Sequence, residues 1–367
     1  MKLEDAIDFN PTEKLAKNTY AKKIGMDKLS PFYKYIGSFE YEKYSGGAKF
    51  RNGDTIVARI TPCLENGKTA YIDLLDDGEI AFGSTEFIVM RNKENVTIPE
   101  YVYYLSISPR FREKAISLMT GTSGRQRVQL DPLKKEKFHI PSIHNQIKMV
   151  KILGTIDEKI KLNSKINNNL YEISKQLLLK YLDENKSSDE INISKFLNIF
   201  TGKKNANETS PTGKYKFFSC APESLLSDTY LCDNAAIIVA GNGAYTGRTR
   251  FYDGKFELYQ RTYGLTLKDG FEKNNIYGLY VFMKTIFEPD KMGGTHGSAI
   301  PYIVLSDLTD YKLRYNKVEF DKFSNLVSGN IKMIQENEKS NEKLSKLRDT
   351  LLPKLMNSEI DLNNIEI

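Results

Sequence analysis

The stretch IKLNSKINNNLYEISKQLLLKY, residues 160–181, contains neither glycine nor proline and carries apolar residues at helical spacing. It recurs as IQENEKSNEKLSKLRDTLLPKL at residues 334–355, with 8 identities in 22 positions at a constant offset of 174. In the longer runs 149–181 and 323–355, apolar and asparagine positions alternate at four and three residues, which is typical of a coiled-coil seam. We therefore predict two equivalent helices, each about 50 Å long at about 1.5 Å per residue.

Two asparagines occupy matched seam positions in each predicted helix, Asn163 and Asn167 in the first and Asn337 and Asn341 in the second. A buried polar residue at a seam costs stability and fixes the register of the helices. If a pseudo-twofold axis relates antiparallel helices, Asn163 lies near Asn341 and Asn167 near Asn337. We expect these four residues to set the register. The alternative, asparagines that merely face solvent, leaves their repetition at the seam unexplained.

The segments before the two helices also repeat. MTGTSG at residues 119–124 aligns with MGGTHG at 292–297, and GKT at 67–69 aligns with GRT at 247–249. The same alignment pairs Thr85 with Thr262. Duplication of this extent predicts a pseudo-symmetric molecule with small loop insertions. Each segment also has the composition of mixed strands and short helices, with strands expected at 54–60 and 236–240 and helices at 101–119 and 276–287.

The predicted fold class is α+β with a pseudo-twofold internal repeat. Two similar globular α/β domains are separated by two long helices that form an antiparallel coiled coil. The expected segments are a first globular domain at 1–141, a central spacer helix at 142–187, a second globular domain at 188–316, and a C-terminal spacer helix and tail at 317–367.

The composition supports ordinary packed cores. Apolar residues make up 40% and aromatic residues 11% of the 367 positions, and this length fits two domains or more. Fully disordered and fibrous chains are excluded. The 53 Lys and Arg residues exceed the 47 Asp and Glu residues, so the formal net charge is only +6. Binding to DNA would therefore depend on locally placed basic residues rather than on the average charge.

The sequence predicts a soluble, cytoplasmic protein that neither enters a membrane nor binds a metal. Its longest aliphatic run, 235–240, is far shorter than the ~20 apolar residues of a spanning helix, and the acidic start MKLEDAIDF does not look like an export signal. The three histidines are scattered, without metal-ligand spacing. The three cysteines are not closely paired, which fits a reducing compartment: Cys63, Cys220 and Cys232.

Known catalytic motifs are absent from the sequence. GNGAYTGRT at 241–249 differs from a phosphate-binding P-loop, because five residues separate Gly241 from Gly247 and Arg248 follows, so a hairpin loop is expected there. Signatures of hydrolases, metalloproteases, dinucleotide-binding enzymes and deaminases are missing. The glycine loop and the Asn/Asp-Pro-Pro-aromatic motif of a methyltransferase are missing too. We predict no catalytic residue and no cofactor bound by this chain.

Basic residues interleaved with Gly, Ser, Thr and aromatic residues fall at similar places in the two globular segments. Such residues on glycine-rich loops can approach phosphates and base edges. Each one alone could be an ordinary solvated charge, but the set favours a DNA-binding footprint. The candidate DNA contacts are Arg59, Lys68, Thr122, Ser123, Arg125 and Arg127 in the first segment and Lys203, Lys204, Arg248, Arg250, Arg261 and His296 in the second.

The order of these motifs resembles the specificity subunit of type I restriction-modification systems, over essentially the whole chain. The resemblance is strongest over FGSTEFIVMR at 82–91, TGTSGRQRVQLDPLKKEKFHIPS at 120–142, the helical run 146–182, and SKLRDTLLPKLMNSEI at 345–360. Four motifs in this order, together with the duplication, are specific for that family.

The resemblance implies that the globular segments are target recognition domains, each reading one half of a bipartite sequence in double-stranded DNA. It implies that the two helices set the gap between the half-sites. The implied subunit is non-catalytic and docks two methyltransferase (M) subunits, which use S-adenosylmethionine. In a full complex it also carries restriction (R) subunits, which use ATP and Mg. The stretch GSAIPYIV at 297–304 differs from GRQRVQLD at 124–131, which fits readers of different sequences.

Two other interpretations stay open. A coiled-coil scaffold that presents two duplicated binding domains would explain the helices and the repeat but not the motifs. A nuclease or methyltransferase with unrecognised motifs would need catalytic groups that the sequence does not display. The DNA sequence recognised cannot be derived, because base choice also depends on loop geometry and DNA shape.

Overall fold

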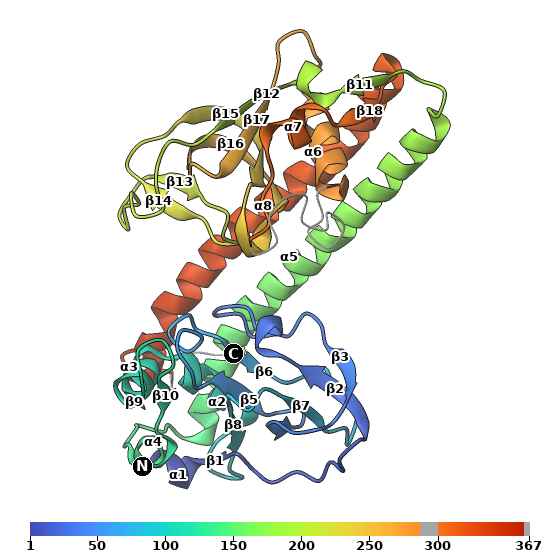
Figure 1. The fold of residues 1–367 in the computed structure, drawn as a ribbon. Helices are drawn as coiled ribbons and strands as arrows, with labels where there is room; N and C mark the ends of the chain where they lie inside the picture. Colours follow the sequence, from blue (N-terminus) through green and yellow to red (C-terminus); the bar gives the residue numbers. More distant parts are fainter. Residues whose placement is uncertain (287–299, 363–367) are drawn as a thin grey trace. The chain divides into compact units, whose positions relative to one another are not determined.

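The computed structural model describes residues 1–286 and 300–362 (Figure 1). The chain forms two compact units. Unit 1 comprises Met1–Asn163 and Ser340–Ile367, and unit 2 comprises Ser164–Lys339. Each unit therefore contains a globular part and one half of each long helix. This differs from the four consecutive segments expected from the sequence, because each helix half packs into the core of its own unit.

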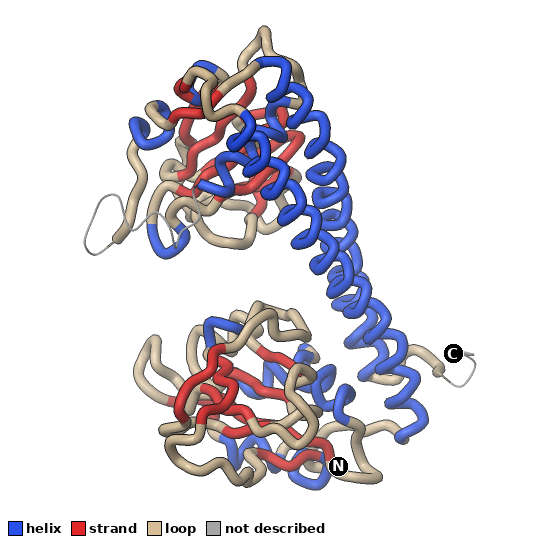
Figure 2. Tube along the Cα trace, turned by 90° about the vertical axis from the view of Figure 1, so that its right-hand side faces the viewer, coloured by secondary structure: helices blue, strands red, loops and turns tan. Residues whose placement is uncertain are grey.

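The two long helices are α5 (Ile143–Glu184) and α8 (Lys317–Met356). In unit 1 the start of α5 and the end of α8 are antiparallel, since Asn163 bonds to Asn341 and, further from the middle of α5, Asp157 bonds to Arg348. Figure 2 shows both as blue helices lying side by side within each unit. Among the helices of residues 1–286 and 300–362, none is long and apolar enough to cross a membrane.

In unit 2 the remaining halves of α5 and α8 are also antiparallel. Nδ2 of Asn337 donates to Oδ1 of Asn167 at 2.8 Å, and Nδ2 of Asn330 donates to Oγ of Ser174 at 3.1 Å. Toward the end of α5, Tyr181 stacks on Phe323 with ring centroids 5.5 Å apart. The seam is thus polar near its asparagines and aromatic at its outer end. The predicted pairing of Asn167 with Asn337 is confirmed.

The globular part of unit 1 is built from short strands and helices. Its helices are α1 (Leu3–Ala6), the 3-10 helix η1 (Met26–Lys28), α2 (Pro99–Ile107), α3 (Pro109–Ser117) and α4 (Leu130–Lys135). Its strands are β1 (Ile7–Phe9), β2 (Tyr20–Ile24), β3 (Glu40–Lys43), β4 (Lys49–Phe50), β5 (Thr55–Ala58), β6 (Thr69–Tyr71), β7 (Ala81–Gly83), β8 (Phe87–Asn92), β9 (Met119–Thr120) and β10 (Arg127–Val128). They form two four-stranded sheets, β1-β8-β5-β6 and β3-β2-β7-β4, and the hairpin of β9 and β10.

Helix α2 links the main sheet of unit 1 to its helix pair. All four residues of β5 are buried, as expected of a central strand. Tyr101, Tyr103 and Tyr104 of α2 are buried too, and their apolar cluster includes Leu153 of α5 and Leu352 of α8. The hydroxyl of Tyr104 also reaches α5. The sheet, α2 and the helix pair therefore share one core.

The helical run expected at 101–119 is interrupted at Ser108. The residue before a proline is disfavoured in the α conformation, and Pro109 follows. Ser108 is accordingly extended, with φ −63° and ψ 145°. Its Oγ accepts a hydrogen bond from the Phe111 N–H at 3.4 Å and so caps α3.

Within residues 188–286 and 300–316, the globular part of unit 2 has fewer strands than that of unit 1, and several of them are longer. Its helices are the 3-10 helices η2 (Ile193–Lys195) and η3 (Gly243–Tyr245), then α6 (Asn275–Ile286) and α7 (Leu305–Thr309). Its strands are β11 (Glu190–Asn192), β12 (Leu197–Thr201), β13 (Tyr215–Phe218), β14 (Leu225–Ser227), β15 (Cys232–Ala240), β16 (Thr249–Leu258), β17 (Thr262–Leu267) and β18 (Lys312–Arg314). They form a six-stranded sheet, β12-β17-β15-β16-β13-β14, and the pair β11-β18.

The central strands follow the same order in both units, β1-β8-β5-β6 in unit 1 and β12-β17-β15-β16 in unit 2. Val57 pairs with Thr69 in unit 1, and Val239 pairs with Thr249 in unit 2. The alignment of 67–69 with 247–249 is therefore confirmed. The internal repeat is a repeat of strand order and pairing, not only of sequence.

The alignment of Thr85 with Thr262 is wrong by two residues. Ala58 of β5 pairs with Phe87 of β8, and at the equivalent place Ala240 of β15 pairs with Thr262 of β17. Thr262 thus corresponds to Phe87. A single shared threonine in a turn does not define an alignment, whereas strand pairing does.

Candidate nucleic-acid interface

In unit 1 the loop after β5 meets the hairpin β9–β10. The Thr61 N–H donates to the carbonyl oxygen of Gln126 at 3.0 Å, and the Val128 N–H donates to that of Arg59 at 2.9 Å. The Arg59 N–H donates in turn to the carbonyl oxygen of Glu86, just before β8, at 2.9 Å. Three loops that are distant in the sequence therefore gather at one end of the sheet.

Three predicted contacts in these loops have protein partners. Nε of Arg127 lies 2.9 Å from both carboxylate oxygens of Glu86, and Nη2 of Arg127 lies 2.7 Å from Oε1. These hydrogen bonds lower the pKa of the Glu86 carboxyl group. Nζ of the half-buried Lys68 donates to the carbonyl oxygen of Met26 at 2.8 Å. Arg59 is also half-buried and donates weakly, at 3.4 Å, to the carbonyl oxygen of Val128.

The tip of the hairpin is exposed. Thr122, Ser123 and Arg125 all face solvent. Gly121 (φ 128°) and Gly124 (φ 77°) take conformations that other residues rarely adopt, which allows the tight turn between β9 and β10. Among the described residues, the Arg125 side chain has no hydrogen-bond or ion-pair partner, so its guanidinium is available to a ligand.

Unit 2 repeats the backbone hydrogen bonds of these loops. The Gly241 N–H donates to the carbonyl oxygen of Arg261 at 2.9 Å, the Ile303 N–H donates to that of Gly241 at 2.8 Å, and the Gly243 N–H donates to that of Pro301 at 3.0 Å. Each bond has the same place relative to β15 and β17 as its counterpart has relative to β5 and β8. The loop assembly is therefore part of the internal repeat.

The matching hydrogen bonds define equivalent positions in the two units. Gly241 takes the place of Arg59, and Arg261 takes the place of Glu86. Likewise Arg127, which forms a bridge with Ile60, corresponds to Tyr302, which forms a bridge with Asn242. The equivalent loops therefore carry different charges, although their backbones pair in the same way.

Three predicted contacts in unit 2 are held by the protein. Nη1 and Nη2 of Arg250 donate to the carbonyl oxygens of Pro222 and Ser219 at 3.0 and 2.5 Å, and burial lowers the pKa of Arg250 to about 10. The Arg248 guanidinium lies 4.2 Å from the centre of the Tyr245 ring. Nζ of Lys204 donates to two hydroxyl groups, those of Ser227 at 3.1 Å and Thr229 at 2.6 Å.

Two predicted contacts in unit 2 are exposed. Lys203 and Arg261 face solvent, and within the described part of the chain neither side chain has a hydrogen-bond or ion-pair partner. They are brought close in the fold, because the Gln260 N–H donates to the carbonyl oxygen of Lys204 at 2.9 Å. His296, and with it the stretch 292–297, lies outside the described residues.

Sequence reasoning missed Glu86 and the buried ion pair of the helices. Oδ1 of Asp157 lies 2.9 Å from Nη1 of Arg348, and both side chains are only 3% exposed. Oδ2 of Asp157 accepts a hydrogen bond from the Tyr104 hydroxyl at 2.7 Å. The ion pair could have been predicted from the sequence, because Arg348 occupies a seam position and Asp157 directly follows one. Glu86 lies within the motif FGSTEFIVMR at 82–91, but nothing in that motif indicates that its partner is Arg127.

Carboxylates that stood alone in the sequence have structural partners. Asp54, for example, lies 2.7 Å from Nε of Arg91, and Glu65 accepts a hydrogen bond from the Thr61 hydroxyl at 2.9 Å. In residues 1–286 and 300–362, no three His, Cys, Asp or Glu side chains are grouped so that they could hold a metal ion. The loops instead offer guanidinium, ammonium and hydroxyl groups, which suit contacts to phosphates and base edges.

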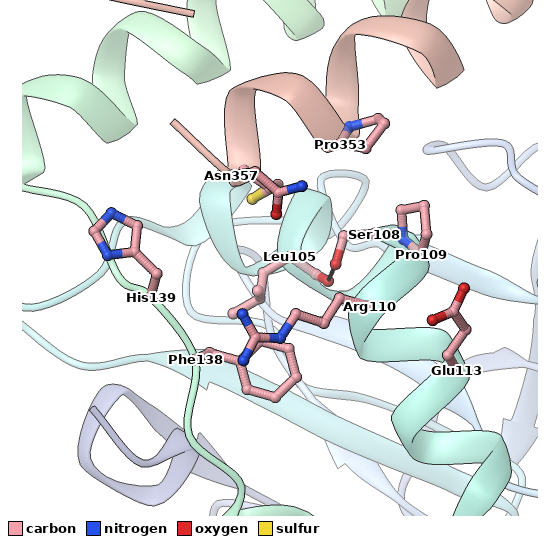
Figure 3. Close-up of a pocket in the computed structure, with 10 residues that line it drawn as sticks. Leu105, Ser108, Pro109, Arg110, Glu113, Phe138, His139, Pro353 and Asn357 are labelled. Carbon is pink, nitrogen blue, oxygen red and sulfur yellow. Dashed lines mark hydrogen bonds between the residues drawn. The ribbon is translucent and has the colours of Figure 1, made fainter. Parts of the chain in front are cut away.

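A separate pocket of about 250 Å³ lies in unit 1 between α3 and the end of α8 (Figure 3). Its walls include Arg110, whose guanidinium lies 5.1 Å from the centre of the Phe138 ring. His139 and Asn357 line it as well. None of the predicted DNA contacts lines this pocket, so it is not part of the loop assembly.

Comparison with known proteins shows what the sequence and the fold of this chain resemble. Residues 1–172 match the family described as "Type I restriction modification DNA specificity domain". Over 123 residues the chain is 32% identical to the type I restriction enzyme EcoDI specificity subunit of Escherichia coli, covering 33% of this chain and 26% of that protein. Over 128 residues it is 29% identical to the HindI specificity subunit of Haemophilus influenzae, covering 35% and 27%.

Residues 1–172 are therefore similar to that specificity domain. The matches cover about a quarter of the length of these curated relatives. The crystal structure of the type I restriction-modification S subunit from M. genitalium is 18% identical, with a TM-score of 0.54, covering 97% of this chain and 95% of that one. This likeness indicates that the chain shares the fold of that structure.

Proposed function

We propose that this chain is the non-catalytic DNA-recognition subunit of a type I restriction-modification complex. Each unit reads one half of a bipartite target in double-stranded DNA through its loop assembly, and α5 and α8 set the gap. The carrying observation is the repeat of the loop hydrogen bonds around Glu86 in unit 1 and Arg261 in unit 2. The family match ends at residue 172, and this repeat supports extending a reading role to unit 2.

The proposal assigns the chemistry to partner subunits. Methyltransferase subunits, two per chain because the chain is a twofold repeat, dock on the chain and use S-adenosylmethionine to methylate adenine. Restriction subunits, where present, use ATP and Mg. The chain itself binds DNA and holds no cofactor. The proposed location is the cytoplasm, where DNA and these cofactors are found together.

In unit 1 the side chains proposed to reach DNA are those at the hairpin tip, Thr122, Ser123 and Arg125. In unit 2 they are Lys203 and Arg261. Their exposure supports this choice. The other predicted cations, which bond to protein atoms, are proposed to shape the loops. A loop cation that reaches a phosphate adds to affinity without adding sequence preference, whereas contact to a base edge adds specificity.

The test is methylation with and without the chain. The purified chain, supplied with the methyltransferase that copurifies with it and S-adenosylmethionine, should direct adenine methylation to a bipartite sequence with a fixed gap. Sequencing of methylated sites reads out the result. The methyltransferase alone is the control and should not methylate that sequence.

Two outcomes would overturn the proposal. Methylation or cleavage of DNA by the partner-free chain would contradict a non-catalytic role. An unchanged methylation pattern when the chain is omitted would favour the scaffold interpretation, in which the two units bind proteins rather than DNA.

A further inference from the structure

Glu86 and Arg261 occupy equivalent backbone positions in the two units but carry opposite charges. In each unit the carbonyl oxygen of this residue accepts a hydrogen bond, at 2.9 Å, from the residue that directly follows a central strand. That residue is Arg59 after β5 in unit 1 and Gly241 after β15 in unit 2. The charge reversal therefore lies at a matched point of two loop assemblies.

Glu86 holds the guanidinium of Arg127 in a bidentate pair. Nε and Nη2 of Arg127 are both engaged, at 2.9 and 2.7 Å, by the carboxylate of Glu86. The third nitrogen, Nη1, lies 3.4 Å from the carbonyl oxygen of Arg125. A phosphate approaching Arg127 would have to displace a carboxylate and remain beside its negative charge. The pair is therefore nearly neutral toward DNA.

The same pair lies next to the hairpin tip. Arg127 begins β10 and is fixed on one side by Glu86, while its Nη1 reaches back to the backbone at Arg125. The Arg125 N–H closes the turn by donating to the carbonyl oxygen of Thr122 at 3.0 Å. Arg125 is therefore the exposed cation of a turn that its own backbone hydrogen bond to Thr122 closes.

Unit 2 lacks this pair. At the position of Glu86 it carries Arg261, which is exposed, and among the described residues no carboxylate pairs with its side chain. At the position of Arg127 it carries Tyr302, which has no charge. The cation of this assembly thus sits at the start of β17 rather than on the neighbouring loop.

We propose that Glu86 is a positioning residue that withholds Arg127 from DNA, and that Arg261, its counterpart, contacts a DNA phosphate directly. This proposal rests on the proposed function as a DNA reader. It assigns the phosphate contact of unit 1 to Arg125 and that of unit 2 to Arg261. The two units therefore present their cations to DNA from different loops of the same assembly.

The salt dependence of DNA binding tests this assignment. The slope of log Kobs against log salt concentration is negative, and each phosphate neutralised by a protein cation makes it steeper by about 0.9. We would measure this slope by fluorescence anisotropy for the full chain on a labelled duplex. The variants R261Q and R125Q should each lose one phosphate contact, so each should make this slope shallower by about 0.9. The double variant E86Q/R127Q should leave it unchanged.

Two further variants separate positioning from simple structural support. E86Q frees Arg127 and should steepen the slope by about 0.9, which loss of structure would not do. E86D retains the ion pair and should bind with the wild-type slope. K273Q is the matched control, because Lys273 is exposed and follows the far end of β17, away from Thr262. Thermal unfolding of every variant checks that each is folded.

The outcomes distinguish the two proposals. A wild-type chain that shows no salt-dependent binding would refute the DNA-reading function itself. If the wild-type chain binds DNA and E86Q/R127Q makes the slope shallower, Arg127 contacts a phosphate, and the proposed role of Glu86 is overturned. Wild-type binding with an unchanged slope in R261Q would overturn the role of Arg261.

Discussion

Asn163 donates a hydrogen bond from Nδ2 to Oδ1 of Asn341 at 2.8 Å, across 178 residues of sequence. Its counterpart in unit 2 is the bond of the same length from Asn337 to Asn167. Each amide pair satisfies a donor and an acceptor that a shifted register would leave facing apolar side chains. An unsatisfied buried amide costs about 1–3 kcal/mol, so these pairs favour one register over its neighbours.

Replacing all four asparagines with leucine should raise the midpoint of thermal unfolding, because apolar seam residues stabilise a coiled coil more than amides do. The same change should loosen the register and broaden the gap in the methylated sequence. Thermal denaturation followed by circular dichroism, and sequencing of methylated sites, measure the two effects. Leucines at the exposed Asn168 and Asn169 are the control and should change neither. A lower midpoint with a sharp, unchanged gap would contradict a register role.

Inserting seven residues into α5 alone should abolish methylation or alter the gap, because the seam partners in α8 would no longer match. Inserting seven residues into both helices, after Lys165 and after Lys339, should restore pairing and lengthen the spacer by about 10 Å. If the helices set the gap between the half-sites, as proposed, this gap should then grow by about three base pairs at about 3.4 Å each. Methylated-site sequencing reads the gap. An unchanged gap when both helices carry the insertion would contradict the role of the helices as a spacer.

Exchanging residues 1–141 for the corresponding segment of a relative should change one half of the methylated sequence and leave the other half intact. The reason is that each loop assembly is formed by hydrogen bonds within its own unit. The reciprocal exchange of 188–316 is the matched experiment and should change only the other half. Simultaneous change of both halves would mean that the two units do not read independently.

Truncating Arg348 to alanine should lower the free energy of unfolding by about 3–5 kcal/mol, because it leaves the carboxylate of Asp157 buried without its cation. Burial by itself would lower the pKa of Arg348, but Asp157 raises it, so the guanidinium stays charged in the core. The double variant D157L/R348M replaces both charges with apolar groups and should regain most of the loss. Urea denaturation measures both. A double-variant loss equal to the sum of the losses in the single variants D157L and R348M would show that the charges do not interact.

The sequence by itself determined the helices, the repeat and the antiparallel register. Heptad spacing and matched asparagines are local patterns, and the duplication at an offset of 174 made the pairing of Asn163 with Asn341 a matter of symmetry. The sequence also showed that both globular parts contain loops in which basic residues alternate with Gly, Ser, Thr and aromatic residues. These features need no knowledge of how distant loops meet.

Tertiary structure alone decided which loop cations are available. Arg125 and Arg127 are equivalent in sequence terms, yet Glu86, 41 residues away from Arg127, binds one and not the other. The alignment of Thr262 failed because turns carry no periodicity, whereas strand pairing assigned it to Phe87. The charge of a loop depends on which carboxylate the fold brings beside each guanidinium, and that contact is made between distant segments that no local pattern connects.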